Sequence, residues 1–85
     1  MTTTVPPRLT LYSKPGCHLC DEMKHVIDTV AARMPVALEV IDITTDPRLE
    51  ALYGTEIPVL FVGEKKAAKY RVTPEELERR IRGAG

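Results

Sequence analysis

Residues 11–34 have the sequence LYSKPGCHLCDEMKHVIDTVAARM, and they contain the two cysteines of the chain, Cys17 and Cys20. Cys17 directly follows the turn-forming residues KPG, so we expect a strand to end and a helix to begin there. The helix is predicted over residues 17–34, because its apolar side chains recur at spacings of three and four. This apolar stripe consists of Cys20, Met23, Ile27, Val30 and Met34. The stretch therefore predicts a strand–turn–helix unit with a Cys-X-X-Cys pair at the start of the helix.

Outward from the helix at 17–34, hydrophobic patterns and turn residues predict six further elements, the first of which is the strand of this unit. They are a strand at 8–13, a strand at 36–43, a short helix at 47–53 that ends at Gly54, a strand at 57–63, a strand at 67–72 and a helix at 73–81. In the last helix, Thr73 and Glu76 form a capping box. The order β-α-β-α-β-β-α predicts an α/β fold with a four-stranded mixed sheet and helices on both faces.

Length and composition indicate one domain, residues 1–85. Hydrophobic residues make up 44% of the chain, which is enough to build a core. A pair of cysteines so close in sequence cannot brace a fold. The N-terminal residues show no basic segment followed by an apolar run, so we expect no signal peptide. No apolar segment approaches the roughly 20 residues that cross a bilayer. We therefore expect a cytoplasmic monomer that does not contact membranes.

The charges of the chain argue against nucleic-acid binding. Twelve basic and twelve acidic residues balance. The two basic clusters, EKKAAKYR at 64–71 and ERRIR at 78–82, both include acidic residues. Nucleic-acid-binding domains usually gather a basic excess on one face. We therefore expect no nucleic-acid partner.

The position of the cysteine pair favours a reactive dithiol. The free N–H groups and the dipole of a helix N-terminus stabilise a thiolate, which lowers the pKa of Cys17. Cys20 follows one turn later on the apolar stripe, where it should be more buried. Cys17 would attack a substrate disulfide, and Cys20 would then resolve the mixed disulfide by closing the Cys17–Cys20 bond. The pair thus predicts a dithiol that cycles between reduced and oxidised forms.

Other interpretations of the pair remain open. A structural zinc site needs four ligands, and only His18 and His25 could add nitrogen ligands. His25 lies more than two helical turns from Cys17, so we expect no metal bound within one chain. A non-catalytic binding or adaptor module is the alternative, including one that bridges a metal or iron–sulfur cluster between chains. Small core residues would be a third explanation, which suits Cys20 better than Cys17.

Together, KPGCHLC after a strand, EIPVLF at 56–61 and a terminal helix resemble the glutaredoxins, small members of the thioredoxin superfamily. More narrowly, the chain is similar to glutaredoxin-like proteins with a KPGCHLCD-type motif. The resemblance covers roughly residues 8–82. It implies the thioredoxin fold and a thiol–disulfide oxidoreductase. It further implies that Cys17 is the nucleophile and Cys20 the resolving cysteine.

The resemblance also assigns roles outside the dithiol. Lys14 matches a basic residue that helps to hold the thiolate and a glutathione carboxylate, although a solvated turn lysine is an equal alternative. Pro58 resembles the family's cis-proline, which packs opposite the dithiol. Ile57 before it could then pair with an extended peptide or glutathione. His18 would either tune the thiolate or be an exposed bystander.

The chain departs from the family at two places that concern the reductant. Glu56 stands where glutaredoxins usually carry threonine, and residues 64–76 lack the Gly-Gly that holds glutathione. The resemblance implies no bound metal or organic cofactor. It leaves glutathione and a thioredoxin-reductase-type protein as candidate electron donors. Asp42 and Tyr12 are secondary candidates: Asp42 as proton acceptor or strand-end cap, and Tyr12 as a wall of the dithiol cleft.

Overall fold

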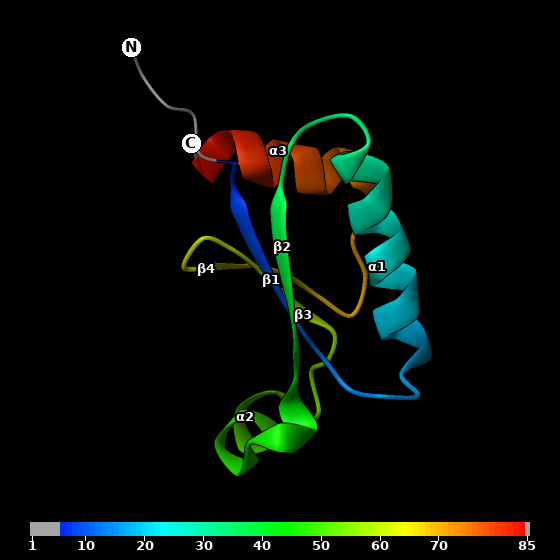
Figure 1. Ribbon diagram of the computed structural model, residues 1–85, viewed down its shortest axis with the longest axis vertical. Coiled ribbons are helices and arrows are strands. Elements are labelled where there is room, and N and C mark those ends of the chain that lie inside the picture. Colours follow the sequence, from blue (N-terminus) through cyan, green and yellow to red (C-terminus); the bar gives the residue numbers. More distant parts are fainter. Residues whose placement is uncertain (1–5, 85) are drawn as a thin grey trace.

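A computed structural model of the protein describes residues 6–84, and residues 1–5, on which the expectation of no signal peptide partly rests, lie outside it (Figure 1). The predicted order of strands and helices is confirmed. The elements are β1 Arg8–Ser13, α1 His18–Ala31, β2 Ala37–Asp42, the short 3-10 helix η1 Ile43–Thr45, α2 Pro47–Tyr53, β3 Val59–Val62, β4 Lys65–Lys69 and α3 Pro74–Ala84.

The four strands form one mixed sheet in the order β2-β1-β3-β4. β1 pairs parallel with β2 and antiparallel with β3, and β3 pairs antiparallel with β4. Helices α1 and α3 lie on one face, whereas α2 lies beyond one end of the sheet (Figure 1). From there Tyr53 of α2 stacks on Tyr12, which points away from the α1 face because side chains alternate along β1. Helices therefore meet both faces, as predicted, but α2 covers only one end of its face.

The main core fills the space between the sheet and the helices α1 and α3. We use this name for ten buried residues: Leu9, Leu11, Met23, Ile27, Val30, Leu60, Val62, Val72, Leu77 and Ile81. The predicted stripe of α1 is buried from Cys20 to Val30, and Met34 packs against the core in a partly buried position. The periodic apolar pattern of the sequence thus forms the core that fixes α1 on the sheet.

Several predicted boundaries were wrong: β3 covers Val59–Val62 and not residues 57–63, and α3 continues to Ala84 rather than ending at residue 81. Helix α1 ends at Ala31 and not at residue 34, because the N–H groups of Arg33 and Met34 both turn back to the Val30 carbonyl. Pro35 also disfavours a helical conformation at the residue before it. Strand β4 covers Lys65–Lys69 and not residues 67–72, since Tyr70 has a positive φ of 69° and leaves the strand.

Gly54 ends α2 as predicted, but it is not a left-handed C-terminal cap. It has a right-handed φ of −55°, so no left-handed cap requires glycine there. Instead, a Cβ at this position would lie 2.5 Å from the Glu50 carbonyl oxygen. Glycine is needed because the backbone of α2 passes too close for any side chain.

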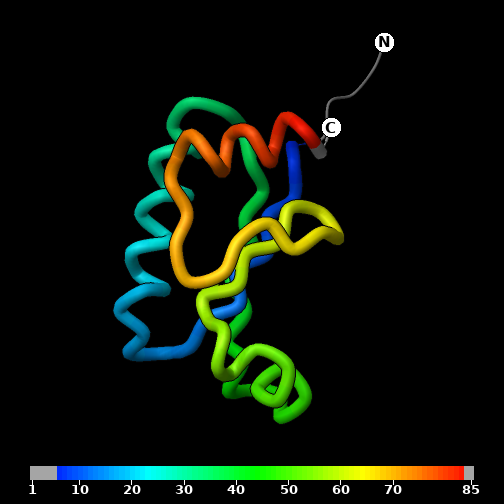
Figure 2. Tube along the Cα trace, turned by 180° about the vertical axis from the view of Figure 1, so that it is seen from behind, coloured from blue at the N-terminus to red at the C-terminus, as the bar shows by residue number. Residues whose placement is uncertain are grey.

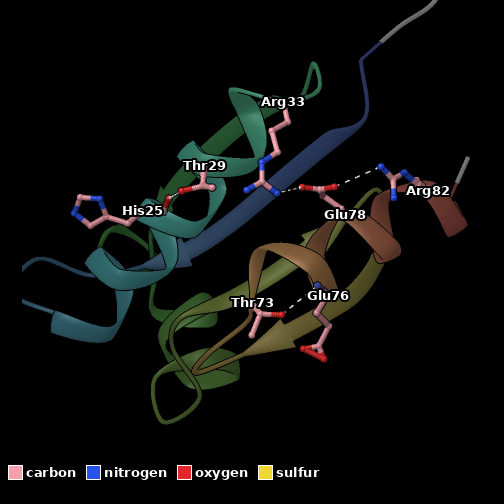
Figure 3. A network of polar contacts seen from close by, with 7 residues as sticks. All are labelled: His25, Thr29, Arg33, Thr73, Glu76, Glu78 and Arg82. Carbon is pink, nitrogen blue, oxygen red and sulfur yellow. Dashed lines mark hydrogen bonds and ion pairs between the residues drawn. The ribbon is translucent and has the colours of Figure 1, made fainter.

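Polar contacts hold α3 against α1 (Figure 3). Arg33 after α1 donates to the Glu78 carboxylate at 2.8 Å, and Arg82 contacts the same carboxylate at 3.4 Å. The Thr73 hydroxyl accepts the N–H of Glu76 at 3.1 Å, which confirms Thr73 as the cap of α3. Among the described residues, none of the helices combines the length and apolarity needed to span a membrane.

Candidate active site

Cys17 and Cys20 are joined by a disulfide at the N-terminus of α1, with their Cα atoms 5.2 Å apart. Cys17 is the N-cap of the helix, and its Sγ accepts the backbone N–H of Cys20 at 3.1 Å. Cys17 is half-buried, whereas Cys20 is 2% exposed. The geometry therefore gives the two sulfurs different surroundings: the helix N-terminus and partial access for Cys17, and burial for Cys20.

A second buried cluster surrounds the dithiol, and we call it the site cluster. Its buried members are Cys20, Ile43 and Ile57. Cys17, Tyr12, Leu49 and Tyr53 pack against them in partly buried positions. The cluster brings together the start of α1, η1, the end of α2 and the segment before β3. The structure thus brings the dithiol and Ile57 into one cluster, together with Ile43 and Tyr53.

The peptide bond between Ile57 and Pro58 is cis, and both residues are buried. Pro58 has no N–H, and its carbonyl accepts the N–H of Tyr70 at 2.9 Å. In the described part of the chain, neither the N–H nor the carbonyl of Ile57 has a hydrogen-bond partner. Beside the dithiol, Ile57 therefore offers one free donor and one free acceptor to an extended chain.

Tyr70 contacts the segment around Pro58, which no pattern in the sequence indicated. Its hydroxyl donates to the Thr55 carbonyl at 3.2 Å, so the residue contacts the segment before Pro58 as well as Pro58 itself. With Arg71 it also lines a groove of about 320 Å³ along α1. A tyrosine with positive φ breaks the usual preference for glycine, so no sequence rule would have predicted this turn.

His18 is highly exposed, with 87% of its side chain accessible. Its Nε2 lies 3.2 Å from Glu22 Oε2, and the other oxygen of Glu22 is 3.5 Å from Arg71. Of the two interpretations of His18, the structure shows the exposed position, and the tuning of the thiolate stays a prediction. His25 is exposed in the middle of α1, where its carbonyl accepts the Thr29 hydroxyl (Figure 3).

Lys14 and Asp42 lie beside the dithiol. Together with Ser13, Gly16 and Cys20 they line a shallow depression of about 210 Å³. Asp42 caps η1, because its Oδ1 accepts the N–H of Thr44 at 2.9 Å and the Thr44 hydroxyl at 2.6 Å. These hydrogen bonds hold the pKa of the Asp42 carboxyl below its usual range. Of its two predicted roles, the structure shows the cap.

The acidic residue that departs from the glutaredoxin pattern is paired in the structure. Glu56 Oε1 lies 3.3 Å from Lys66 Nζ on β4, and this pairing offsets the Glu56 charge.

Tyr12 packs against the site cluster, and burial raises its pKa, with smaller contributions from Tyr53 and Glu39. Within residues 6–84, His, Cys, Asp and Glu side chains form no group of three that could hold a metal ion.

Comparison with known proteins gives one family and a consistent fold. The profile of the glutaredoxin-like domain (DUF836) matches residues 8–82. The solution structure of protein Ne2328 from Nitrosomonas europaea is 34% identical, with a TM-score of 0.77 over 94% of this chain and 98% of that one. The X-ray structure of protein XcR50 from X. campestris is 27% identical, with a TM-score of 0.78 over 91% and 99%.

A thioredoxin shows the same architecture at greater distance. Desulfothioredoxin from Desulfovibrio vulgaris Hildenborough is 26% identical, with a TM-score of 0.64 over 95% of this chain and 83% of that one. The predicted thioredoxin fold is therefore confirmed.

Proposed function

The chain belongs to the glutaredoxin-like domain family, and on that premise we propose that it is a thiol–disulfide oxidoreductase whose reactive groups are Cys17 and Cys20. The observation that carries the proposal is the Cys17–Cys20 pair at disulfide distance, with Cys17 as the cap of α1. The N–H of Cys20, which reaches Cys17 Sγ, can stabilise negative charge on that sulfur after reduction. Cys17 would therefore react first.

The proposed reaction moves two electrons from the dithiol to a disulfide-bearing substrate, here called the client. The Cys17 thiolate attacks one client sulfur, the client disulfide breaks, and the other client sulfur leaves as a thiolate. Cys20 then loses its proton and attacks Cys17 Sγ, which releases the second client thiol and forms the Cys17–Cys20 disulfide. A two-electron thiol reductant restores the dithiol. No step requires a metal or a bound organic cofactor.

Three further residues have proposed roles in this cycle. The free N–H and carbonyl of Ile57, ahead of the cis bond to Pro58, would pair with the client backbone as an added strand. Lys14, exposed at the depression beside Cys20, would attract a carboxylate of glutathione or of the client. His18, next to Cys17, would favour the thiolate when protonated. The pairing of Glu56 with Lys66 supports access of an acidic ligand.

Trapping the mixed disulfide tests the proposal. The reduced Cys20→Ser variant, mixed with a peptide disulfide, should accumulate an adduct on Cys17 that mass spectrometry detects. The Cys17→Ser variant is the matched control and should trap far less. Alkylation of both cysteines across pH, read by peptide mass, should show Cys17 reacting first. Equal trapping by the two variants, or equal alkylation below pH 7, would contradict the proposed roles.

The electron donor is the next part of the proposal. We propose that the protein works in a reducing compartment such as the cytoplasm, where thiol reductants are available. The oxidised protein should be reduced by glutathione or by a thioredoxin-reductase system, and comparing the two rates identifies the donor. If both fail, a general reductase is excluded and a dedicated partner remains. A dithiol that never turns over would instead favour a binding module.

A further inference from the structure

Tyr70 has a backbone conformation that tyrosine rarely adopts. Its φ is 69°, and the N–H of Arg71 donates to the Lys69 carbonyl at 2.8 Å across it. A positive central φ and a hydrogen bond between residues two apart are the features of a classic γ-turn, which is rare and strained. Glycine would adopt this conformation without the steric cost. The tyrosine side chain should therefore supply something that glycine cannot.

The side chain and the backbone of Tyr70 hold opposite ends of one short segment. The Tyr70 hydroxyl donates to the Thr55 carbonyl at 3.2 Å, and the Tyr70 N–H donates to the Pro58 carbonyl at 2.9 Å. Between these ends, the N–H of Glu56 is already used by the Tyr53 carbonyl at 2.8 Å. Within the described chain, the N–H and carbonyl of Ile57 are thus left free in a segment fixed on both sides.

The next residue connects the same turn to the helix that carries the dithiol. Arg71 Nη1 lies 3.5 Å from the carboxylate of Glu22, on the second turn of α1. Figure 2 shows the connection between β4 and α3 running alongside α1, and the groove lined by residues of both agrees with this. The Tyr70 turn therefore lies between the two segments whose alignment matters for the chemistry: residues 55–58 and the start of α1.

We propose that Tyr70 is a positioning residue that holds residues 55–58 so that Ile57 receives the client backbone beside Cys17. This inference rests on the proposed function and deepens it. Tyr70 does not take part in the exchange of electrons between sulfurs. Its contribution is to client binding, so its loss should raise KM for an extended client and leave the reactivity of Cys17 toward a small reagent unchanged.

Two variants separate the hydroxyl from the backbone strain. Tyr70→Phe keeps the ring and loses the bond to Thr55, whereas Tyr70→Gly suits the positive φ and loses the side chain. With a peptide disulfide as substrate, both should raise KM about three- to tenfold, the value of one hydrogen bond, with kcat within about twofold of wild type. Iodoacetamide should alkylate Cys17 at the wild-type rate in both variants.

Thr29→Val is the matched control, because it also removes a hydroxyl that donates to a backbone carbonyl, here that of His25 at 3.0 Å (Figure 3). It should leave KM unchanged. A purely structural role of Tyr70 predicts that KM follows the unfolding temperature, so that Tyr70→Gly behaves as wild type wherever it is equally stable. The measured KM and unfolding temperature of each variant distinguish these roles.

The remaining outcomes are equally decisive. If wild type turns over and either variant keeps its KM, or if Thr29→Val raises KM as much, the positioning role of Tyr70 is overturned and the proposed function stands. If wild type shows no turnover with any client or donor, the proposed function fails and this inference fails with it.

Discussion

The main core and the site cluster differ in size and in origin. Ten buried residues form the main core, and three form the site cluster. The main core comes from regular elements, β1, α1, β3 and α3, together with Val72 just before α3. The site cluster instead gathers Cys20 from α1, Ile43 from η1 and Ile57 from the connection before β3. Half-buried Cys17, Tyr12 and Tyr53 border the site cluster, so it reaches the surface.

This difference separates stability from chemistry. Full burial of an aliphatic side chain contributes about 1.5–3 kcal/mol, so the ten residues of the main core dominate the free energy of folding. The site cluster contributes less, but it sets the relative positions of the dithiol and Ile57. A substitution in the main core should therefore affect stability more than activity, and one in the site cluster should do the reverse. Four variants test this, from the largest expected effect to the smallest.

Cys17→Ser should have the largest effect, and on activity alone. The hydroxyl that replaces the thiol is not a nucleophile toward disulfides at neutral pH, so reduction of a peptide disulfide should be abolished. Because Cys17 is half-buried at the edge of the site cluster, the free energy of unfolding of the variant should stay close to that of the reduced wild type.

Turnover measurements and urea unfolding of both reduced proteins check this prediction. Cys20→Ser is the control, since it retains Cys17 and should still form a mixed disulfide. Residual turnover in Cys17→Ser, or unfolding of the variant, would break the separation of stability from chemistry.

Leu77→Ala should have the next largest effect, on stability alone. Leu77 of α3 is fully buried in the main core, and Leu→Ala substitutions at such sites cost about 2–5 kcal/mol. Urea unfolding measures the loss. The folded fraction should keep the wild-type kcat and KM, because Leu77 belongs to the main core and not to the site cluster. A specific activity that falls after correction for the unfolded fraction would contradict the comparison.

The two clusters also differ in how far the sequence predicted them. The stripe from Cys20 to Val30 and the alternation in residues 8–13 repeat with the periods of a helix and a strand, so the main core and α1 followed from local pattern. The site cluster has no period, because Ile43 and Ile57 meet Cys20 only after the chain has folded. Cys17, Cys20 and Pro58 stand in recognisable motifs and could be identified from the sequence. Ile43 stands in no such motif, so the sequence did not indicate its place in the site cluster.

What the sequence could not predict was set by tertiary contacts. Strand β4 was placed too late, since nothing in AAKYRV shows that Tyr70 turns out of the strand to reach Pro58 and Thr55. The pairing of Glu56 with Lys66 was missed for the same reason: the two residues become neighbours only when β3 and β4 form their hairpin. Both omissions concern contacts to residues 55–58, the segment that carries the cis bond and Ile57, and functional segments are where local rules are most often broken.

Ile57→Ala should cost less stability than Leu77→Ala and more activity. Ile57 is 9% exposed in the site cluster, so we expect its free energy of unfolding to fall by about 2 kcal/mol, the lower end for such substitutions. Its backbone would contact the client, and the segment should lose alignment without the side chain that packs on Cys20. KM for a peptide disulfide should rise while Leu77→Ala leaves it unchanged. The reverse order in either measurement would contradict the division between the clusters.

Asp42→Asn should have the smallest effect, visible as a change in pH dependence. Asp42 caps η1, which carries Ile43 into the site cluster, and the hydrogen bonds from Thr44 hold its pKa below the usual range. A lowered pKa in the folded state means that the carboxylate stabilises the fold above the unfolded pKa of about 3.9, and that this contribution is lost as pH falls through the lower folded pKa. Asparagine keeps an acceptor but does not titrate. In urea unfolding between about pH 6 and pH 2, wild type should therefore lose its advantage over Asp42→Asn as the pH falls. A difference that stays constant over this range would mean that the Asp42 charge does not support the cap, and that Ile43 is held in the site cluster by packing alone.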